Sequence, residues 1–286
     1  MTQLLSGAPV AEKIREKSRQ ESERLKSSGI TPLLAVLRIG DKADTASYAA
    51  SLEKNAPKSG VAIRRCELPG DIPAEKAAAA IRELNEDPGV SGILLLRPLP
   101  PHLPEEELCG LIAPEKDVDC ATDISLAGVF SGRELGFAPA TPLAVMKMLD
   151  FYQIPLEGKK AVVLGRSLVV GRPLAMMLME RHATVTICHS RTGDISEYTR
   201  GADIVVAALG KPEALGAGAL GEGQVIIDVG IHRKPDGHLC GDVDFAAVSE
   251  HAAAITPVPG GVGAVTTAVM LEQVVRAALR SEKQKK

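Results

Sequence analysis

Short apolar runs alternate with helix-like segments along the whole chain, and this alternation limits the folds that the sequence can adopt. Apolar runs bounded by proline or glycine predict buried strands in the first half at 33–37 and 92–96. The second half predicts further strands at 161–164, 183–188, 202–209, 224–229 and 254–256. Helices are expected at 10–26, 44–58, 73–84, 172–181 and 265–280. Strands that alternate with helices favour an α/β fold built on parallel sheets.

The length of the chain and a proline-flanked position predict two domains. A chain of 286 residues can form one large domain or two of ordinary size. Pro139 and Pro142 mark a candidate boundary. We expect an amino-terminal domain at 1–140 and a second domain at 141–265, with a helix at 266–286 that packs back on the first domain.

Composition narrows the class of function. The net charge of −3 gives no field that would attract nucleic acid or an anionic membrane, and an aromatic content of 2% argues against base stacking. The amino terminus does not resemble a signal peptide, and no apolar run approaches the ~20 residues of a membrane span. The five cysteines are scattered, with no C-x-x-C pair, so we expect no metal site and a reduced, cytoplasmic protein.

The strongest local motif is the segment 163–173, in which a strand runs into Gly165, crosses a short loop and meets Gly171 at the start of a helix. In doubly wound folds this arrangement presents backbone N–H groups and a helix amino terminus to phosphate. The segment is not a G-x-G-x-x-G fingerprint, because Arg166 and Ser167 fill its middle. A plain strand-to-helix turn is therefore the alternative interpretation.

The end of the next strand favours NADP over NAD. An NAD site commonly has Asp or Glu about 20 residues after the glycines, to bind the ribose hydroxyls. Here the stretch after Cys188 contains Ser190, Arg191 and Thr192 and no carboxylate. A 2′-phosphate is favoured by such donors, and Arg166 can add another; a solvated surface arginine is the alternative for Arg191.

A third loop, at 257–263, contains two prolines and three glycines after the last predicted strand. Such a backbone lets a ligand approach closely, and its place at the carboxyl end of a strand fits a cofactor site. Thr266 and Thr267 follow at a helix start. A tight strand-to-helix connection remains the alternative.

These segments, taken together in one order along nearly the whole chain, resemble the methylenetetrahydrofolate dehydrogenase/methenyltetrahydrofolate cyclohydrolase family of the bifunctional FolD type. The resemblance implies an amino-terminal folate-facing domain, a carboxy-terminal NADP-binding Rossmann domain and a substrate cleft between them. It also implies a cytoplasmic homodimer that interconverts tetrahydrofolate one-carbon derivatives, with a link to purine biosynthesis. The motifs that carry it include Lys116-Asp117-Val118-Asp119, Pro98-Leu99-Pro100, Asp228-Val229-Gly230-Ile231 and Gly241-Asp242-Val243-Asp244-Phe245.

The resemblance also implies roles for individual residues. Tyr48 and Asp119 are expected to be catalytic, with Asp119 holding the pterin. The expected substrate-binding residues are Tyr48, Leu52, Leu96, Pro98, Asp119 and Gly261. The expected cofactor-binding residues are Gly165, Arg166, Ser167, Gly171, Ser190, Arg191, Thr192, Gly210, Ile231, Gly261 and Thr266.

The sequence departs from the family pattern at the two positions that matter most for proton transfer. The family has Tyr-x-x-x-Lys on a helix, whereas Leu52 follows Tyr48 here by four residues. The family motif Leu-Val-Gln-Leu-Pro-Leu-Pro becomes Leu-Leu-Leu-Arg-Pro-Leu-Pro, with Leu96 in place of Gln. Lys54 is two residues beyond Leu52, which turns it away from Tyr48 on a helix. Other departures are Cys120 for Gly, Ala140 for Cys, His232 for Asn, and Ala264 and Val265 for Pro-Met.

Four hypotheses follow. The first is an NADP-dependent methylenetetrahydrofolate dehydrogenase with weak or absent cyclohydrolase activity, since hydride transfer needs mainly orientation whereas hydrolysis needs proton transfer. The second is the full bifunctional enzyme, which also gives 10-formyltetrahydrofolate, with His102 or Asp123 as the first candidate bases. The third is a non-catalytic protein that binds NADP or folate. The fourth is an oxidoreductase that uses another small substrate.

Overall fold

The computed structural model describes residues 2–284, except for the side chains of residues 43, 44 and 284. The chain divides into two compact units, unit 1 (Met1–Ala11 and Thr141–Thr266) and unit 2 (Glu12–Ala140 and Thr267–Lys286). The first eleven residues, which we expected in the amino-terminal domain, belong to unit 1. The reason is that β1 (Gln3–Leu4) pairs with β11 (Ala254–Ile255), which lies in the second half of the chain.

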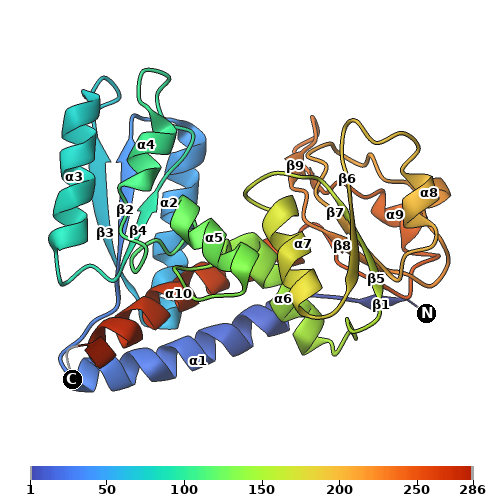
Figure 1. Ribbon diagram of the computed structural model, residues 1–286, viewed down its shortest axis with the longest axis horizontal. Helices are drawn as coiled ribbons and strands as arrows, with labels where there is room; N and C mark the ends of the chain where they lie inside the picture. Colours follow the sequence, from blue (N-terminus) through green and yellow to red (C-terminus); the bar gives the residue numbers. More distant parts are fainter. Residues whose placement is uncertain (1, 285–286) are drawn as a thin grey trace. The chain divides into compact units, whose positions relative to one another are not determined.

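Unit 1 contains a six-stranded sheet in the order β1-β11-β8-β7-β5-β6, in which neighbouring strands are parallel (Figure 1). The strands not yet defined are β5 (Lys160–Leu164), β6 (Thr184–Cys188), β7 (Ile204–Ala207) and β8 (Val225–Asp228). After β5 the chain adds β6 on one side and β7 on the other, so the strand order reverses at β5. In doubly wound sheets, ligands bind at the carboxyl ends of the strands beside such a reversal.

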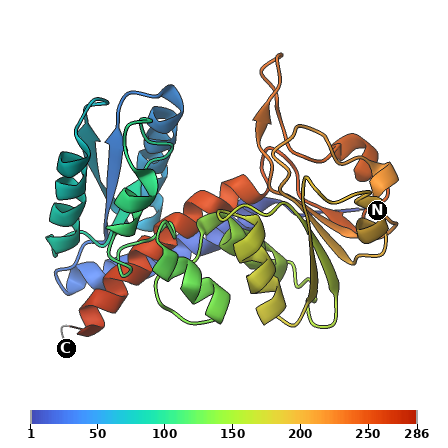
Figure 2. The ribbon, with the colours of Figure 1, turned by 45° about the horizontal axis from the view of Figure 1, so that its top comes forward.

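Helices and a hairpin complete unit 1. Helix α7 contributes the buried side chains of Leu174 and Leu178 to the interior, and Val162, Val205 and Ile226 lie in the buried core that the strands form. The antiparallel hairpin β9–β10 projects from the rest of the unit (Figure 2). The element bounds are α6 (Ala140–Phe151), α7 (Gly171–Glu180), α8 (Ser196–Thr199), η2 (Ala217–Ala219), β9 (His232–Arg233), β10 (Leu239–Cys240) and α9 (Phe245–Val248).

Unit 2 contains a parallel three-stranded sheet with β2 in the middle, and α3 packs on it through Ala77, Ile81 and Leu84 (Figure 1). The strands are β2 (Leu33–Ile39), β3 (Ala62–Leu68) and β4 (Gly92–Leu95). The helices are α1 (Gly7–Ser27), α2 (Ala43–Asn55), η1 (Ala56–Ser59), α3 (Ala74–Glu86), α4 (Glu105–Gly110), α5 (Asp123–Ser131) and α10 (Val262–Gln284). Helices α1, α6 and α10 each contain a boundary between the two units.

The sequence analysis did not predict β3, and the composition of this strand explains why. Arg64, Arg65 and Glu67 lie on it, and its burial alternates only weakly because it is an edge strand. Charged residues on an edge strand also discourage pairing with another chain. An apolar pattern is therefore a poor guide to this element.

One helix in the described part of the chain, at Val262–Lys283, is long and apolar enough to cross a membrane by length and composition. We had expected no apolar segment of this length. Within its most apolar window, 61% is buried inside the protein, as in the core helix of a globular unit. Its side-chain amide at Gln273 donates to the carbonyls of Val118 (2.7 Å) and Ala138 (3.0 Å), which ties this helix to the loops of unit 2.

Candidate functional site

The turn from β5 into α7 is built around two glycines that leave room only for backbone. Gly165 has a φ of +137°, and a Cβ at this position would lie 2.2 Å from the carbonyl oxygen of Ala208. A Cβ on Gly171 would lie 2.1 Å from the Gly165 carbonyl oxygen. Both positions therefore require glycine, and the loop between them passes close to the amino terminus of α7. A turn of this kind can hold a phosphate on its backbone N–H groups.

The segment that follows the neighbouring strand, β6, carries polar side chains and lies beside this loop. Leu164 and Cys188 are partners in the β5–β6 register, so the segments that follow them leave the sheet side by side. Arg166, Ser190 and Arg191 are all exposed. The Thr192 hydroxyl accepts a hydrogen bond from the His189 N–H at 2.9 Å and fixes this second loop. The arrangement brings two guanidinium groups and a hydroxyl to one edge of the sheet.

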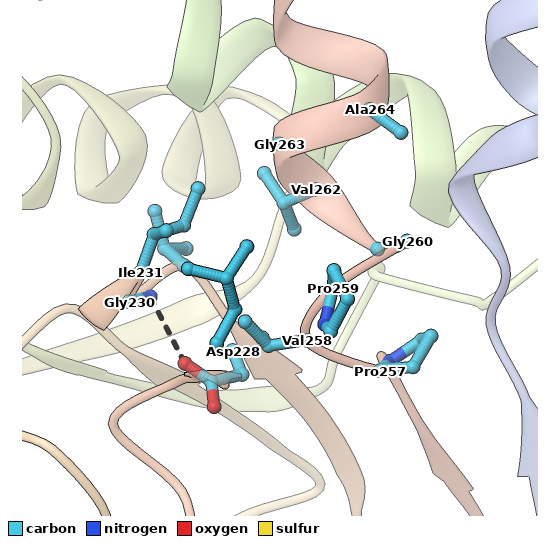
Figure 3. A pocket seen from close by; sticks show the side chains of 13 residues that line it. Asp228, Gly230, Ile231, Pro257, Val258, Pro259, Gly260, Val262, Gly263 and Ala264 are labelled. Atoms are coloured by element: carbon cyan, nitrogen blue, oxygen red, sulfur yellow. Dashed lines mark hydrogen bonds between the residues drawn. The ribbon is translucent and has the colours of Figure 1, made fainter. Parts of the chain in front are cut away.

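A cavity of about 260 Å³ lies at the carboxyl ends of β8 and β11 (Figure 3). Its walls are the segments 228–231 and 257–264 together with Leu239, and they are mostly apolar. Ile231 and Val262 face each other across it in Figure 3, and Ile231 is 58% exposed. Gly261 is required in the wall, because a Cβ there would lie 2.4 Å from the carbonyl oxygen of Pro257. The cavity can take a flat ring of modest polarity.

Two buried carboxylates hold the loops between these features. Asp242 accepts hydrogen bonds from the backbone N–H groups of Leu209 (2.6 Å), Gly210 (3.1 Å) and Lys211 (3.0 Å). His232 Nε2 lies 2.7 Å from the same carboxylate. Asp228 similarly accepts from Gly230, Asp242 and Val243, and burial raises its pKa. These contacts fix the backbone beside the cavity.

The residues of unit 1 fit a dinucleotide. The glycine cradle suits a pyrophosphate, the guanidinium groups after β5 and β6 suit a 2′-phosphate, and the apolar cavity suits a nicotinamide ring. Thr266, the remaining residue expected at the cofactor, is half-buried in α10 and donates to the carbonyl of Val262 at 3.2 Å. All the expected cofactor residues lie at or after the carboxyl ends of β5, β6, β7, β8 and β11.

In unit 2, α2 places Tyr48 and Leu52 one turn apart on the same face. Leu52 is fully buried, whereas Lys54 is exposed, as the helical spacing predicted. Burial raises the pKa of Tyr48 well above its usual range, and the charge of Asp119 adds to this increase. Leu96 follows β4 directly, is 5% exposed, and its N–H donates to the carbonyl of Leu37 at 2.9 Å. The two leucines therefore present no ionisable group in this part of the unit.

The loop that carries Asp119 is held by its neighbour Asp117. This fully buried carboxylate accepts four hydrogen bonds, from the N–H groups of Ala121 (2.7 Å) and Thr122 (2.9 Å) and from the hydroxyls of Thr122 (2.7 Å) and Ser125 (2.6 Å). The loop is also attached to β4, because the Ile93 N–H donates to the carbonyl of Lys116 at 2.8 Å. Asp119 is thus fixed near the end of β4.

Cys120, the residue after Asp119, has a φ of +57°. A glycine adopts this left-handed conformation freely, whereas other residues pay roughly 1–2 kcal/mol. The family's glycine at this position therefore has a conformational reason. The thiol is buried, and burial raises its pKa, which disfavours the thiolate.

Asp119 itself is half-buried and has an unusual protonation equilibrium. Burial raises its pKa to about 7, and the charge of Arg97 opposes this increase. Arg97 Nη2 lies 3.8 Å from Asp119 Oδ2. The sequence analysis did not include Arg97 among the site residues. The signal for it is the charged residue in an otherwise apolar run before Pro98.

The other folate-site candidates are placed differently. Pro98 is exposed, and its carbonyl accepts from Lys42 Nζ at 3.3 Å. His102, considered as a replacement base, is exposed, and its Nε2 lies 3.0 Å from the carbonyl oxygen of Ile72. Asp123 is exposed in the first turn of α5. The structure shows no interaction of His102 or Asp123 with Asp119 among the residues that it describes.

Comparison with known proteins agrees with a candidate nucleotide site in unit 1 and a candidate folate site in unit 2. Residues 5–119 match the family model for the tetrahydrofolate dehydrogenase/cyclohydrolase catalytic domain, and residues 139–282 match the model for the NAD(P)-binding domain of the same family. Bifunctional protein FolD 1 of Desulfitobacterium hafniense is 46% identical over 277 residues, which cover 97% of this chain and 99% of the relative.

Two solved structures extend the comparison. The bifunctional FolD enzyme of Campylobacter jejuni is 41% identical with a TM-score of 0.96, covering 98% of this chain and 99% of that one. The Trypanosoma brucei methylenetetrahydrofolate dehydrogenase-cyclohydrolase, solved in complex with NADP and an inhibitor, is 33% identical with a TM-score of 0.92, covering 99% of both chains. The expected two-domain α/β fold and the expected NADP cofactor are confirmed.

Proposed function

The chain belongs to the tetrahydrofolate dehydrogenase/cyclohydrolase family, and we propose that it is an NADP-dependent methylenetetrahydrofolate dehydrogenase whose cyclohydrolase activity is weak or lost. It acts in folate one-carbon metabolism and uses NADP. One observation carries the finer proposal. The positions at which the family has Lys and Gln hold Leu52 and Leu96, with side chains 0% and 5% exposed.

Asp119 is the residue that we propose for holding the substrate. The pterin ring of a folate carries an amino group and a ring N–H side by side, and a carboxylate accepts one hydrogen bond from each. Tyr48 lies close enough for the charge of Asp119 to raise the pKa of its hydroxyl, so it stays protonated and can donate a hydrogen bond. Above pH 7, where Asp119 is ionised, both residues can then orient the folate through hydrogen bonds.

Oxidation of the methylene carbon makes few demands on the protein. NADP, when bound, supplies the acceptor for the hydride. The folate nitrogen beside the carbon stabilises the developing cation with its own lone pair. The residues of unit 2 therefore contribute chiefly orientation and an apolar surface, which are compatible with leucine at positions 52 and 96.

Hydrolysis of the methenyl product makes a different demand. Water must add to the methenyl carbon and lose a proton, and a proton must reach the nitrogen whose bond to that carbon breaks. A positioned acid or base accelerates such steps by roughly 10²–10⁴. Leucine can do neither, Tyr48 stays protonated, and Asp119 is engaged by the pterin. The replacement of both family residues removes the whole proton-transfer pair. Replacement of only one of them would leave the other as a buried polar group without its hydrogen-bond partner.

The decisive experiment mixes the purified protein with methylenetetrahydrofolate and NADP and follows NADPH and methenyltetrahydrofolate absorbance together. We expect NADPH to form and the methenyl product to accumulate. Methenyl product that disappears as fast as it forms would indicate the full bifunctional enzyme and make His102 and Asp123 the next residues to test. Absence of NADPH would favour a non-catalytic binding protein or another substrate.

We further propose a homodimer in a reducing, cytoplasmic compartment. The homodimer is an expectation from the family resemblance. All five cysteines are free, which is compatible with a reducing compartment. Analytical ultracentrifugation tests the homodimer, and localisation of a tagged protein tests the compartment.

A further inference from the structure

Arg97 forms an ion pair with Asp119 that no part of the proposed function uses. It directly follows Leu96 at the end of β4 and is 30% exposed at its side chain, and Asp119 is 28% exposed. In the Leu-Val-Gln-Leu-Pro-Leu-Pro family motif, leucine occupies its place. A cation has therefore entered this part of unit 2 at a position where the family pattern is apolar.

The geometry of the pair leaves the guanidinium with unused donors. Its Nη2 lies 3.8 Å from Asp119 Oδ2, beyond the ~2.7–3.2 Å of a hydrogen bond. Within residues 2–284 the Arg97 guanidinium has this ion pair and no hydrogen bond. A guanidinium has five N–H donors in a fixed plane, so one edge can stay near the carboxylate while another binds a ligand.

A pterin offers a matching partner at that distance. Its 2-amino-4-oxo edge presents, in a row, an amino donor, a ring N–H donor and a carbonyl acceptor. Asp119 can accept from the two donors. The next position along the row then lies beside the carboxylate oxygen, where a donor is needed. We infer that Arg97 donates a hydrogen bond to the pterin 4-oxo group and, with Asp119, reads the complete edge of the ring.

This inference rests on the proposed function, because it requires a pterin on Asp119. It makes Arg97 a specificity-determining residue that selects 4-oxo over 4-amino rings. An amino group at position 4 would point its own donors at the guanidinium. A guanidinium donates hydrogen bonds and accepts none, so Arg97 places a cation in the site without restoring a base.

Arg97 also acts on Asp119 directly. The groups that face this carboxylate are Arg97, Tyr48 of α2, Cys109 of α4, and Asp117 and Cys120 of its own loop. Arg97 is the one cation among these groups, which all lie in the described part of unit 2. Its removal should raise the pKa of Asp119 further. In Arg97→Leu, folate binding should therefore weaken at a higher pH than in the unaltered protein when the pH is lowered.

The test compares binding of 6-methyltetrahydropterin and 2,4-diamino-6-methylpteridine to the unaltered protein, Arg97→Leu and Arg97→Lys by calorimetry. Binding is measured at pH 9, above the raised pKa of Asp119, so that this carboxylate is ionised in all three proteins. The probes also differ at the ring nitrogen that faces Asp119 and in ring reduction, and these differences are then common to the three proteins and cancel when their preferences are compared. We expect the preference for the 4-oxo probe to fall at least 10-fold in Arg97→Leu and to be partly kept in Arg97→Lys. Arg64→Leu, which breaks an ion pair with Asp87 elsewhere in the same sheet, is the matched control and should keep the preference.

Tetrahydrofolate binding separates the possible failures. Tight binding of tetrahydrofolate with an unchanged 4-oxo preference in Arg97→Leu would overturn this inference and leave the proposed function intact. If the unaltered protein does not bind tetrahydrofolate, the proposed function and this inference both fall. Thermal melting identifies a misfolded Arg97→Leu protein, in which case Arg97→Met, whose side chain has no donor, is measured instead and an unchanged preference in it overturns the inference.

Discussion

The candidate sites of the two units differ in the kind of residue that they contain. Unit 1 keeps polar donors and obligatory glycines at the ends of its strands, with a Cβ forbidden at Gly165 and Gly171. Unit 2 has buried leucines at 52 and 96, where its family has an amine and an amide. Unit 1 thus has donors and glycines that suit a nucleotide, while unit 2 has leucine at the two positions where the family pattern has Lys and Gln.

This difference shows that phosphate binding and proton transfer have different structural requirements. A phosphate cradle is made of backbone, so its requirements are steric and a single side chain can destroy it. A proton-transfer pair is made of side chains whose replacement by leucine need not disturb the helix or strand that carries them. Catalytic activity can therefore be lost in unit 2 without visible change in the fold.

The largest expected effect comes from restoring the missing pair. Leu52→Lys together with Leu96→Gln should raise the rate of methenyltetrahydrofolate hydrolysis roughly 100-fold or more, since this is the usual gain from a positioned acid or base. Each single change should give much less, because a buried ammonium without a partner is disfavoured. The rate is followed by methenyl absorbance, and thermal melting checks the fold.

The matched control for this prediction is Leu52→Met with Leu96→Met, which keeps both side chains apolar and should leave hydrolysis slow. Equal gains from the Lys/Gln and Met/Met pairs would show that packing, not proton transfer, limits the reaction. Single variants whose gains simply add to the double-variant gain would show that the two positions do not act together.

The next effect concerns Asp119. Asp119→Asn turns one acceptor into a donor against the pterin and should raise the KM for methylenetetrahydrofolate roughly 30-fold, as expected for a lost charge-assisted hydrogen bond. Because the pKa of Asp119 is raised to about 7, the carboxylate gains protons as the pH falls through this value, and folate KM should rise below pH 7. The variant should lack this pH dependence. Asp71→Asn, an exposed change elsewhere in unit 2, should leave both the KM and its pH profile unchanged.

A smaller effect is expected at the nucleotide. Arg166→Ala should raise the KM for NADP roughly 10-fold and leave the KM for NAD nearly unchanged, because one charge-assisted contact to the 2′-phosphate is removed. Initial rates with each cofactor measure both values. Arg181→Ala removes an exposed arginine that pairs with Asp150 and should change neither KM. An equal loss with both cofactors in Arg166→Ala would mean that Arg166 does not distinguish them.

Local sequence patterns contain more of the candidate site of unit 1 than of unit 2, for a physical reason. The glycine cradle and the donors after β6 are each contiguous in sequence, so local patterns reveal them. The proximity of Arg97 to Asp119 arises from a contact between β4 and a distant loop, made by the Ile93 N–H and the Lys116 carbonyl. No local pattern contains that contact.

Two of the strands that were missed, β1 and β3, follow the same rule. β1 has only two residues, Gln3 and Leu4, and exists because β11 lies beside it in the sheet. β3 is an edge strand with charged residues, so hydrophobic periodicity is weak there. By contrast, the exposure of Lys54 followed from helical geometry alone. Local patterns thus predicted five helices and the buried strands β2, β4, β5, β6, β7, β8 and β11, but they did not predict the helices α4, α5, α6, α8 and α9.

The smallest expected effect is that of Cys120→Gly, a change that compares the left-handed backbone of the two units. Gly165 has no alternative, because a Cβ would meet a carbonyl, whereas Cys120 carries a side chain at φ +57°. Cys120→Gly should remove about 1 kcal/mol of strain and lose a similar amount from a buried thiol, so the free energy of unfolding should change by less than about 1 kcal/mol. Cys120→Val should lower it by more than about 2 kcal/mol, since a β-branched residue is least tolerated at positive φ. Urea denaturation measures both variants, and equal stability of the two would mean that the backbone at residue 120 relaxes out of the left-handed region.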